Sequence, residues 1–270
     1  MKPRPFDYAQ PDTAAEAVAL LAEYGDAARV LAGGQSLVPM LNLRLIDPDM
    51  LIDISQVKEL GAICDLGDVI EIGAAVTQNK LLAWPQLKQK LPLVAAALPY
   101  VGHFQTRNKG TVCGSIAHAD PSSELPLALA VSHGEVVLRS ARGERVLPAS
   151  EFQQDMLTTA READELVAAV RFPVMAGQGV GFHEVARRHG DFAIIAVAAA
   201  AAKDNTIRVG VGGIAGRPMV RDIHGDAAGA IGAWAEELEG YEDLHASAAL
   251  RRDLFRKLGP HVIAQAKGKA

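Results

Sequence analysis

Apolar residues near the start of the chain recur at the spacing of one helix face. From Ala14 onward they stand at i, i+3, i+4 and i+7, which predicts an amphipathic helix. Thr13 with Glu16 three residues later is a capping-box pattern, so the helix should begin there. Gly25 should end it near Tyr24. The sequence therefore predicts a helix between these two signals.

The next apolar stretches are short and are separated by turn residues. Residues 28–32 predict a buried strand, and residues 50–55 predict a second one. Between them, the letters GGQS at 33–36 predict a tight turn, and helical spacing resumes from Leu37 to Leu45. Residues 1–55 should thus form a small helix–strand–turn–helix–strand unit.

A second section alternates apolar and polar residues in the manner of strands. Its predicted elements are a strand at 68–77, a helix capped by Thr77, a helix at 92–101, a hairpin of 135–140 with 143–148, and a strand at 164–173. The glycine-rich stretch 175–181 is the best candidate for a linker.

The pattern of the last third of the chain predicts strands first and helices afterwards. Three strand-like runs lie at 182–188, 191–202 and 206–214, with a hairpin turn at Lys203–Asp204–Asn205. Residues 227–266 are helical in composition. This order suggests a separate α+β domain.

Composition narrows the class of protein. The 270 residues are 49% hydrophobic with a net charge of −5, which argues against a nucleic-acid partner. The opening residues lack the apolar stretch of a signal peptide, and the longest apolar run, 192–202, is too short to span a bilayer. Two cysteines, Cys64 and Cys113, fit a reducing compartment and are too few for an all-cysteine iron–sulfur cluster. We therefore expect a cytoplasmic protein without a transmembrane segment.

The turn at 33–36 has two interpretations of similar weight. It is either a plain tight turn or a backbone cradle for a phosphate, because glycine lets amide N–H groups approach an anion closely. It matches neither the GxGxxG pattern nor the GxxxxGK[ST] loop. The nicotinamide-type Rossmann and nucleoside-triphosphatase interpretations therefore fail.

A second small-residue stretch, predicted to turn at Thr111–Ser115, lies within residues 108–126. Two such turns, each beside a strand, could converge on the two ends of one pyrophosphate. The alternative is two unrelated tight turns. Their shared character favours convergence.

Longer motifs around these turns add specificity. The stretches LAGGQSLVPMLNLRL and QTRNKGTVCGSIAHADPSSELP, with FHEVARRHGDFAIIAVAAA and VGGIAGRPMV further on, resemble the FAD-binding medium subunit of molybdenum hydroxylases. That family includes carbon monoxide, nicotine or quinoline, and xanthine dehydrogenases, and the resemblance covers essentially the whole chain. It implies an α+β fold of the vanillyl-alcohol-oxidase or PCMH type. The FAD-binding domain would be 1–174, with subdomains of about 1–55 and 56–174, and the C-terminal domain of the medium-subunit type would be 175–270.

The resemblance also implies which residues contact FAD. The first set is Val30, Leu31, Ala32, Gly33, Gly34, Gln35, Ser36 and Leu37, with 33–36 over the pyrophosphate. The second set is Gly110, Thr111, Gly114, Ser115, Ala117 and His118. Val101, Ser123, Glu124 and His183 would lie near the cofactor as well.

The function implied by the resemblance is electron transfer. A small subunit would carry 2Fe-2S clusters, a large subunit would carry the molybdenum cofactor and hydroxylate the substrate, and this chain would pass electrons through FAD to an external acceptor. The chain itself would hold no metal and no catalytic acid or base, and the assembly would be a heterotrimer or a dimer of heterotrimers. Two alternatives stay open: a self-contained FAD-dependent oxidoreductase of the same fold superfamily, and a scaffold that has lost the cofactor.

Cys113 departs from the glycine pair that the second motif usually carries. If position 113 needed a positive φ, cysteine would be strained there. We expect instead that Cys113 packs behind the motif as a small apolar residue, without a catalytic role.

Overall fold

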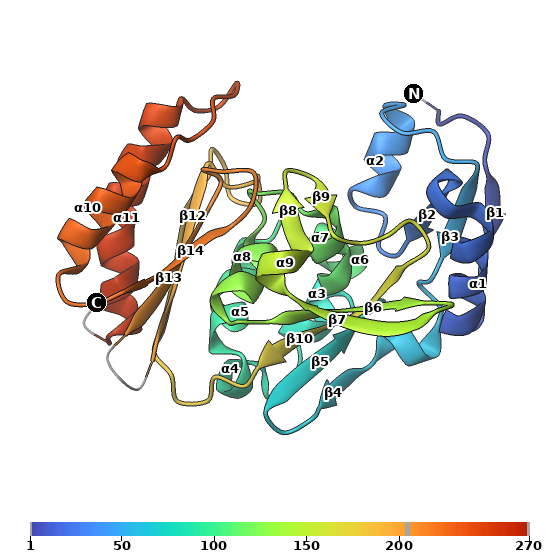
Figure 1. Cartoon of the computed structure of the whole chain (residues 1–270), viewed down its shortest axis with the longest axis horizontal. Coiled ribbons are helices and arrows are strands. Elements are labelled where there is room, and N and C mark those ends of the chain that lie inside the picture. Colours follow the sequence, from blue (N-terminus) through green and yellow to red (C-terminus); the bar gives the residue numbers. More distant parts are fainter. Residues whose placement is uncertain (1, 203–205, 269–270) are drawn as a thin grey trace.

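In the described residues, three large β-sheets follow one another from the N-terminal to the C-terminal end of the molecule, and a small two-stranded sheet accompanies them (Figure 1). The structure is a computed structural model that describes residues 2–202 and 206–268. The turn expected at Lys203–Asp204–Asn205 lies outside the described residues. Mixed helices and sheets confirm the α+β class.

The first sheet is parallel and has the order β1-β3-β2. Its strands are β1 (Asp7–Ala9), β2 (Ala28–Leu31) and β3 (Met50–Asp53), and it is accompanied by α1 (Ala14–Tyr24), η1 (Gly25–Ala27) and α2 (Leu37–Asn42). Thr13 Oγ1 accepts a hydrogen bond from the Glu16 amide, and Gly25 follows the helix at φ +51°. The predicted start and end of α1 are confirmed.

The second sheet is antiparallel, with the order β4-β5-β10-β6-β7. Its strands are β4 (Ile63–Asp65), β5 (Val69–Gly73), β6 (Glu135–Ser140), β7 (Gly143–Pro148) and β10 (Leu166–Pro173). The predicted hairpin is β6–β7. Shorter elements surround the sheet: η2 (Lys58–Gly61), α3 (Gln78–Leu82), α4 (Leu87–Lys90), α5 (Pro92–Ala97), η3 (Leu98–Tyr100), α6 (Phe104–Lys109), α7 (Val112–His118), α8 (Glu124–Val131), α9 (Ala149–Phe152), β8 (Gln153–Asp155) and β9 (Thr158–Thr159).

The turn expected at Thr111–Ser115 is wrong, because these residues begin helix α7. Thr111 caps the helix through its hydroxyl oxygen, which accepts from the Gly114 amide at 2.9 Å. Helix α8 was not expected at all. After Glu124 it is apolar on every side and almost fully buried, so it lacks the polar face that helical periodicity needs.

The third sheet is antiparallel, with the order β11-β12-β13-β14. Its strands are β11 (Val180–Val185), β12 (Ile195–Ala201), β13 (Ile207–Gly212) and β14 (Met219–Ile223), and two helices follow, α10 (Ala227–Glu237) and α11 (Ala248–Ala266). Strand β14 was not predicted, and β11 begins two residues inside the expected linker. The stretch predicted to be helical, 227–266, contains these two helices.

Alternate residues of β12 serve two hydrophobic cores. Ala196, Ala198 and Ala200 join the core shared with the first two sheets, where α5 and α8 pack. Ile195 and Val197 join a second core beneath α10 and α11. Figure 1 shows these two helices on the outer face of the sheet. The C-terminal sheet is thus buried between helices on both faces.

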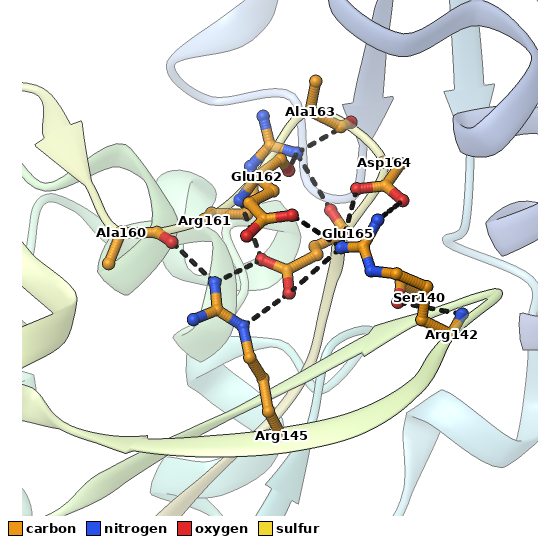
Figure 2. A network of polar contacts seen from close by, with 9 residues as sticks. All are labelled: Ser140, Arg142, Arg145, Ala160, Arg161, Glu162, Ala163, Asp164 and Glu165. Atoms are coloured by element: carbon orange, nitrogen blue, oxygen red, sulfur yellow. Dashed lines mark hydrogen bonds and ion pairs between the residues drawn. The ribbon is translucent and has the colours of Figure 1, made fainter.

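A network of charged side chains fixes the segment that connects β9 to β10 (Figure 2). Arg145 binds both carboxylate oxygens of Glu165 at 2.6 and 2.8 Å, and Arg142 binds Glu162 and Asp164. Arg161 donates to three backbone carbonyls of the same segment. Because Arg142 and Arg145 both belong to the β6–β7 hairpin and both bind this segment, the network holds the segment against β6 and β7.

Candidate functional site

The first glycine motif joins the end of β2 to the start of α2. Gly34 has φ +70°, a conformation that an L side chain rarely adopts. Within the described residues, the backbone amides from Gly33 to Leu37 have no hydrogen-bond acceptor. A row of unpaired amide N–H groups on a turn is a site that favours an anion.

The second glycine motif lies directly against the first. A Cβ placed on Gly33 would stand 2.0 Å from the Lys109 carbonyl oxygen and 2.7 Å from the Gly110 Cα. The backbones therefore touch, so the two motifs lie together as predicted, and their convergence on one pyrophosphate stays a prediction. The reason for glycine at position 33 is this contact. A valine there would push the two motifs apart, so we do not expect a Gly33→Val protein to fold normally.

Helix α7 turns a face of small residues outward. Gly114 and Ala117 are exposed, and Ser115 and His118 are half-buried. The opposite face, Val112, Cys113 and Ile116, is buried against the second sheet. A helix face without large side chains lets a ligand approach the backbone closely.

Two of the first amides of α7 already have partners within the chain. The Val112 amide donates to the Val76 carbonyl at 3.1 Å, and the Gly114 amide donates to Thr111 Oγ1. Gly110 is also held, because its amide donates to Thr106 and its carbonyl accepts from Gln78. The second motif is thus a more fully hydrogen-bonded structure than the first.

Cys113 lies on the buried face of α7 as a small apolar residue, as expected. It is 2% exposed, has helical backbone, and its thiol donates to the Ile72 carbonyl at 3.3 Å. Burial raises the pKa of the Cys113 thiol above its ordinary value. The thiol therefore stays protonated and is not a nucleophile.

Val101 directly follows η3, and helix α6 connects it to the second motif. It is 8% exposed, and its carbonyl and that of Gly102 both accept from Arg107 of α6 at 2.8 Å. The Phe104 ring, on the same short helix, is 59% exposed. Arg107 thus orders the loop that carries Val101.

Ser123 and Glu124 lie beyond the carboxyl end of α7. Ser123 precedes α8, Glu124 begins it, and both are buried. Burial raises the pKa of Glu124 to about 7. Burial also lowers the pKa of His118, so this half-buried ring favours its neutral form.

Sequence reasoning missed Glu184, the neighbour of His183 on β11. Glu184 is 8% exposed, and its Oε2 atom is buried without a hydrogen-bond partner. It faces the same core as Phe182, since alternate strand residues share a face. His183 lies on the other face, against the rings of Tyr100 and His261. The sequence signal that could have identified Glu184 was a charged residue within a predicted strand.

A cavity of about 670 Å³ opens beyond α7. It is lined by the loops 120–122, 156–157, 187–194 and 241–245, together with Arg251. Two non-glycine residues at its edge, Ala119 and Leu157, have left-handed backbone conformations and share a 3.1 Å hydrogen bond. Such conformations concentrate at functional sites.

Within the described residues, no three His, Cys, Asp or Glu side chains are grouped so as to hold a metal ion. The same part of the chain has no helix with the length and hydropathy required to cross a membrane.

The described geometry agrees with comparisons to known proteins. Residues 4–175 match the family described as the FAD binding domain in molybdopterin dehydrogenase. The nicotine 6-hydroxylase medium subunit of Paenarthrobacter nicotinovorans is 34% identical over 98% of this chain and 99% of its own length. The 6-hydroxypseudooxynicotine dehydrogenase complex subunit alpha of the same organism is 41% identical over 72% of this chain and 66% of its own length.

Solved structures resemble the whole chain. Carbon monoxide dehydrogenase from Hydrogenophaga pseudoflava contains a chain with a TM-score of 0.93 and 30% identity, with complete coverage of both chains. Quinoline 2-oxidoreductase from Pseudomonas putida 86 gives a TM-score of 0.93 and 31% identity, covering 100% of this chain and 99% of the other. The family match and the converging glycine motifs lead to one conclusion: the chain belongs to the family of FAD-binding domains of molybdopterin dehydrogenases.

Proposed function

We propose that this chain is the FAD-carrying medium subunit of a heteromeric molybdenum hydroxylase, which transfers electrons from substrate oxidation to an external acceptor. The observation that carries the proposal is the contact between Gly33 and Gly110, which brings two glycine motifs into one surface. The medium-subunit names of relatives that span nearly the whole chain support it further.

The residues present fit FAD. Among the described residues, the five amides from Gly33 to Leu37 have no acceptor and suit the pyrophosphate, and the small-residue face of α7 leaves room for the cofactor. The proposed FAD contacts are Val30, Leu31, Ala32, Gly33, Gly34, Gln35, Ser36, Leu37, Val101, Gly110, Thr111, Gly114, Ser115, Ala117, His118, Ser123, Glu124 and His183. When bound, FAD would supply the oxidation–reduction chemistry.

The chain's own residues would bind and orient the cofactor. Gly34 would bring backbone close to the phosphates, and the neutral His118 would add no charge beside the flavin. The buried Cys113 thiol would keep α7 in place against β5 without taking part in chemistry. We assign no acid or base of this chain to the hydroxylation.

The proposed division is an FAD-binding domain at 1–174, with subdomains of about 1–55 and 56–174, and a C-terminal domain at 175–270. It is supported by the sheet pattern, because each of these segments contains one of the three large sheets. The C-terminal sheet would close the FAD domain on the side of α5 and α8.

The proposed partners are a small subunit with 2Fe-2S clusters and a large subunit with the molybdenum cofactor. Electrons would pass from the clusters to FAD and then to the acceptor, and the assembly would be a heterotrimer or a dimer of heterotrimers in the cytoplasm. The names of the relatives support a multi-subunit complex.

The deciding experiment is affinity purification from the native host, with a visible spectrum and metal analysis of the purified material. Two co-purifying chains, one large and one small, together with FAD, iron and molybdenum, are the expected result. A lone yellow chain without metals would favour a self-contained flavin oxidoreductase. A colourless chain that remains colourless in the presence of FAD and of any co-purified partners would contradict FAD binding itself.

A further inference from the structure

The 670 Å³ cavity beyond α7 is lined by two parts of the chain. Residues 120–122 and 156–157 surround the second sheet, whereas residues 187–194, 241–245 and Arg251 belong to the C-terminal sheet and its helices. Among the described residues that line the cavity, none is a proposed FAD contact. Its volume suits one small organic molecule.

Backbone contacts fix the walls of this cavity. The Leu157 amide donates to the Ala119 carbonyl at 3.1 Å, and both residues have left-handed backbone. Gly190 lies against the preceding domain, because a Cβ there would stand 2.7 Å from the His103 ring. The segments that carry the lining residues are therefore held in place by the fold itself.

Large apolar side chains form part of the lining. Met156 is 46% exposed, Leu157 is 52% exposed and Phe192 is 58% exposed, and all three line the cavity. Exposed apolar side chains that gather around a cavity favour a ligand with an apolar body. The Phe192 ring adds a preference for an aromatic one.

Two hydroxyl groups meet in the lining. Ser122, which is 9% exposed, has its Oγ atom 3.4 Å from the Tyr241 hydroxyl oxygen. Only one proton can lie between two oxygens, so one of the two O–H groups has no acceptor within the described residues. A ligand oxygen that accepts this hydrogen bond would complete the pair.

Arg251 holds Tyr241 in position. Its guanidinium carbon lies 4.2 Å from the centre of the Tyr241 ring, and Nη1 donates to the carbonyls of Ile194 and Gly213. Nη2 donates to Asp243 at 2.6 Å, whereas the buried Nε atom has no partner within the described residues. Arg251 is 1% exposed, so this arrangement is rigid and leaves a second unused donor.

The charges of the lining oppose an anionic ligand. Two guanidinium groups face four carboxylates, which gives a net charge of −2 with His245 neutral; the charged residues are Arg187, Arg251, Asp120, Asp191, Glu242 and Asp243. Arg187 pairs with Asp191, and Arg251 pairs with Asp243. Asp120 and Glu242 have no cation partner within the described residues. A negative lining repels anions and leaves neutral molecules unaffected.

We propose that this cavity is a ligand site, separate from the proposed FAD surface, for a neutral aromatic compound that carries a carbonyl oxygen. The apolar side chains would bury the rings of the ligand, and the free hydroxyl of the Ser122–Tyr241 pair would donate to its oxygen. The carboxylates would exclude anionic analogues. This inference goes beyond the proposed function and does not require FAD.

The first test compares three probes of nearly one shape by equilibrium dialysis of the purified protein with any co-purified partners. The probes are the ketone fluorenone, the hydrocarbon fluorene and the anion fluorenone carboxylate. Fluorenone should bind about tenfold more tightly than fluorene, because it gains one hydrogen bond. Fluorenone carboxylate should bind more weakly than fluorenone.

The second test assigns the binding to the cavity. Phe192→Ala should weaken the binding of fluorenone and of fluorene. Phe104→Ala is the matched control, because Phe104 is 59% exposed and is not a lining residue, and it should leave both affinities unchanged.

Polar variants test the selectivity of the site. Ser122→Ala combined with Tyr241→Phe should remove the preference for fluorenone over fluorene. Either substitution alone should retain much of this preference, because the remaining hydroxyl group can still donate. Asp120→Asn combined with Glu242→Gln should strengthen the binding of fluorenone carboxylate and leave that of fluorenone unchanged.

Three results would overturn the proposal: no binding of fluorenone, equal affinity of the wild type for fluorenone and fluorene, or unchanged affinity in Phe192→Ala. The Phe192 variant alters an exposed side chain, so this outcome does not depend on the folding of the buried double variant. A protein that binds fluorenone as expected but contains no flavin would contradict the proposed function and leave this ligand site established.

Discussion

The two glycine motifs use glycine for different physical reasons. In the first, Gly34 permits a left-handed turn that leaves a row of amides unpaired. In the second, Gly110 and Gly114 permit close packing, and their amides already donate to Thr106 and Thr111. Gly33 belongs to the first motif by sequence but serves the second purpose, since it contacts the backbone at Gly110.

The comparison teaches that shared composition does not mean a shared role. The unpaired amides of the first motif are suited to bind an anion. The second motif instead provides a hydrogen-bonded backbone and a helix face of small residues. Substitutions in the two motifs should therefore separate loss of folding from loss of cofactor.

The largest effect is expected for Gly33→Ala. Its Cβ would lie 2.0 Å from the Lys109 carbonyl oxygen, a backbone atom that cannot move away alone. We expect the variant to be destabilised by about 3 kcal/mol and to lose flavin as a consequence. Urea unfolding, followed by circular dichroism beside flavin absorbance, measures both losses.

Gly61→Ala is the matched control, because no atom lies within 4 Å of the Cβ position there. It should unfold within about 0.5 kcal/mol of the wild type. If Gly33→Ala unfolded at the same urea concentration as Gly61→Ala, the two motifs would not be packed as described.

A smaller effect on folding is expected for Gly34→Ala. The left-handed backbone costs a non-glycine residue about 1 to 2 kcal/mol. Its Cβ meets the Val38 side chain at 3.1 Å, which can shift. The protein should remain folded while its affinity for FAD falls. The backbone at residue 34 would relax away from the strained left-handed conformation, and this change would displace the unpaired amides of residues 33–37. Isothermal titration with FAD of the complex stripped of its flavin is the measurement, and unchanged affinity would argue against a phosphate cradle at this turn.

The smallest effect is expected for Thr111→Val, which removes the cap on the Gly114 amide. Loss of a helix cap costs about 1 kcal/mol. Thr111 is 4% exposed, so FAD affinity should change only slightly through the position of α7.

Thr13→Val is its control, because Thr13 caps α1 in the same manner, away from α7. The two variants should lose similar stability in thermal unfolding. A much greater loss of flavin in Thr111→Val would show that the second motif also binds through its hydroxyl group.

Local signals predicted much of the fold because their effects are local. Helix ends are set within a few residues of Thr13, Thr77 and Gly25. The hairpin of 135–140 with 143–148 follows from the alternation of apolar and polar residues on both sides of a glycine turn. The shared character of the two glycine stretches also predicted that they lie close together, which the contact at Gly33 shows.

The errors arose where tertiary contacts decide the structure. Gly114 weakens helix propensity, but the Thr111 cap and burial of Val112, Cys113 and Ile116 against the sheet favour α7. The role of Gly33 depends on Lys109, which is remote in sequence. The burial of Glu184 depends on how β11 packs against α5, and no local pattern encodes it.

The contact between Gly33 and Gly110 also has a consequence for the order of folding. The chain must close a loop of about 80 residues before these backbones can meet, and such long-range closures carry a large entropy loss that local structure does not repay. The proposed cofactor surface therefore forms late, after the individual helices and hairpins. A ligand that binds only the closed form stabilises it by mass action, so cofactor supply would determine how much of the newly made chain escapes proteolysis.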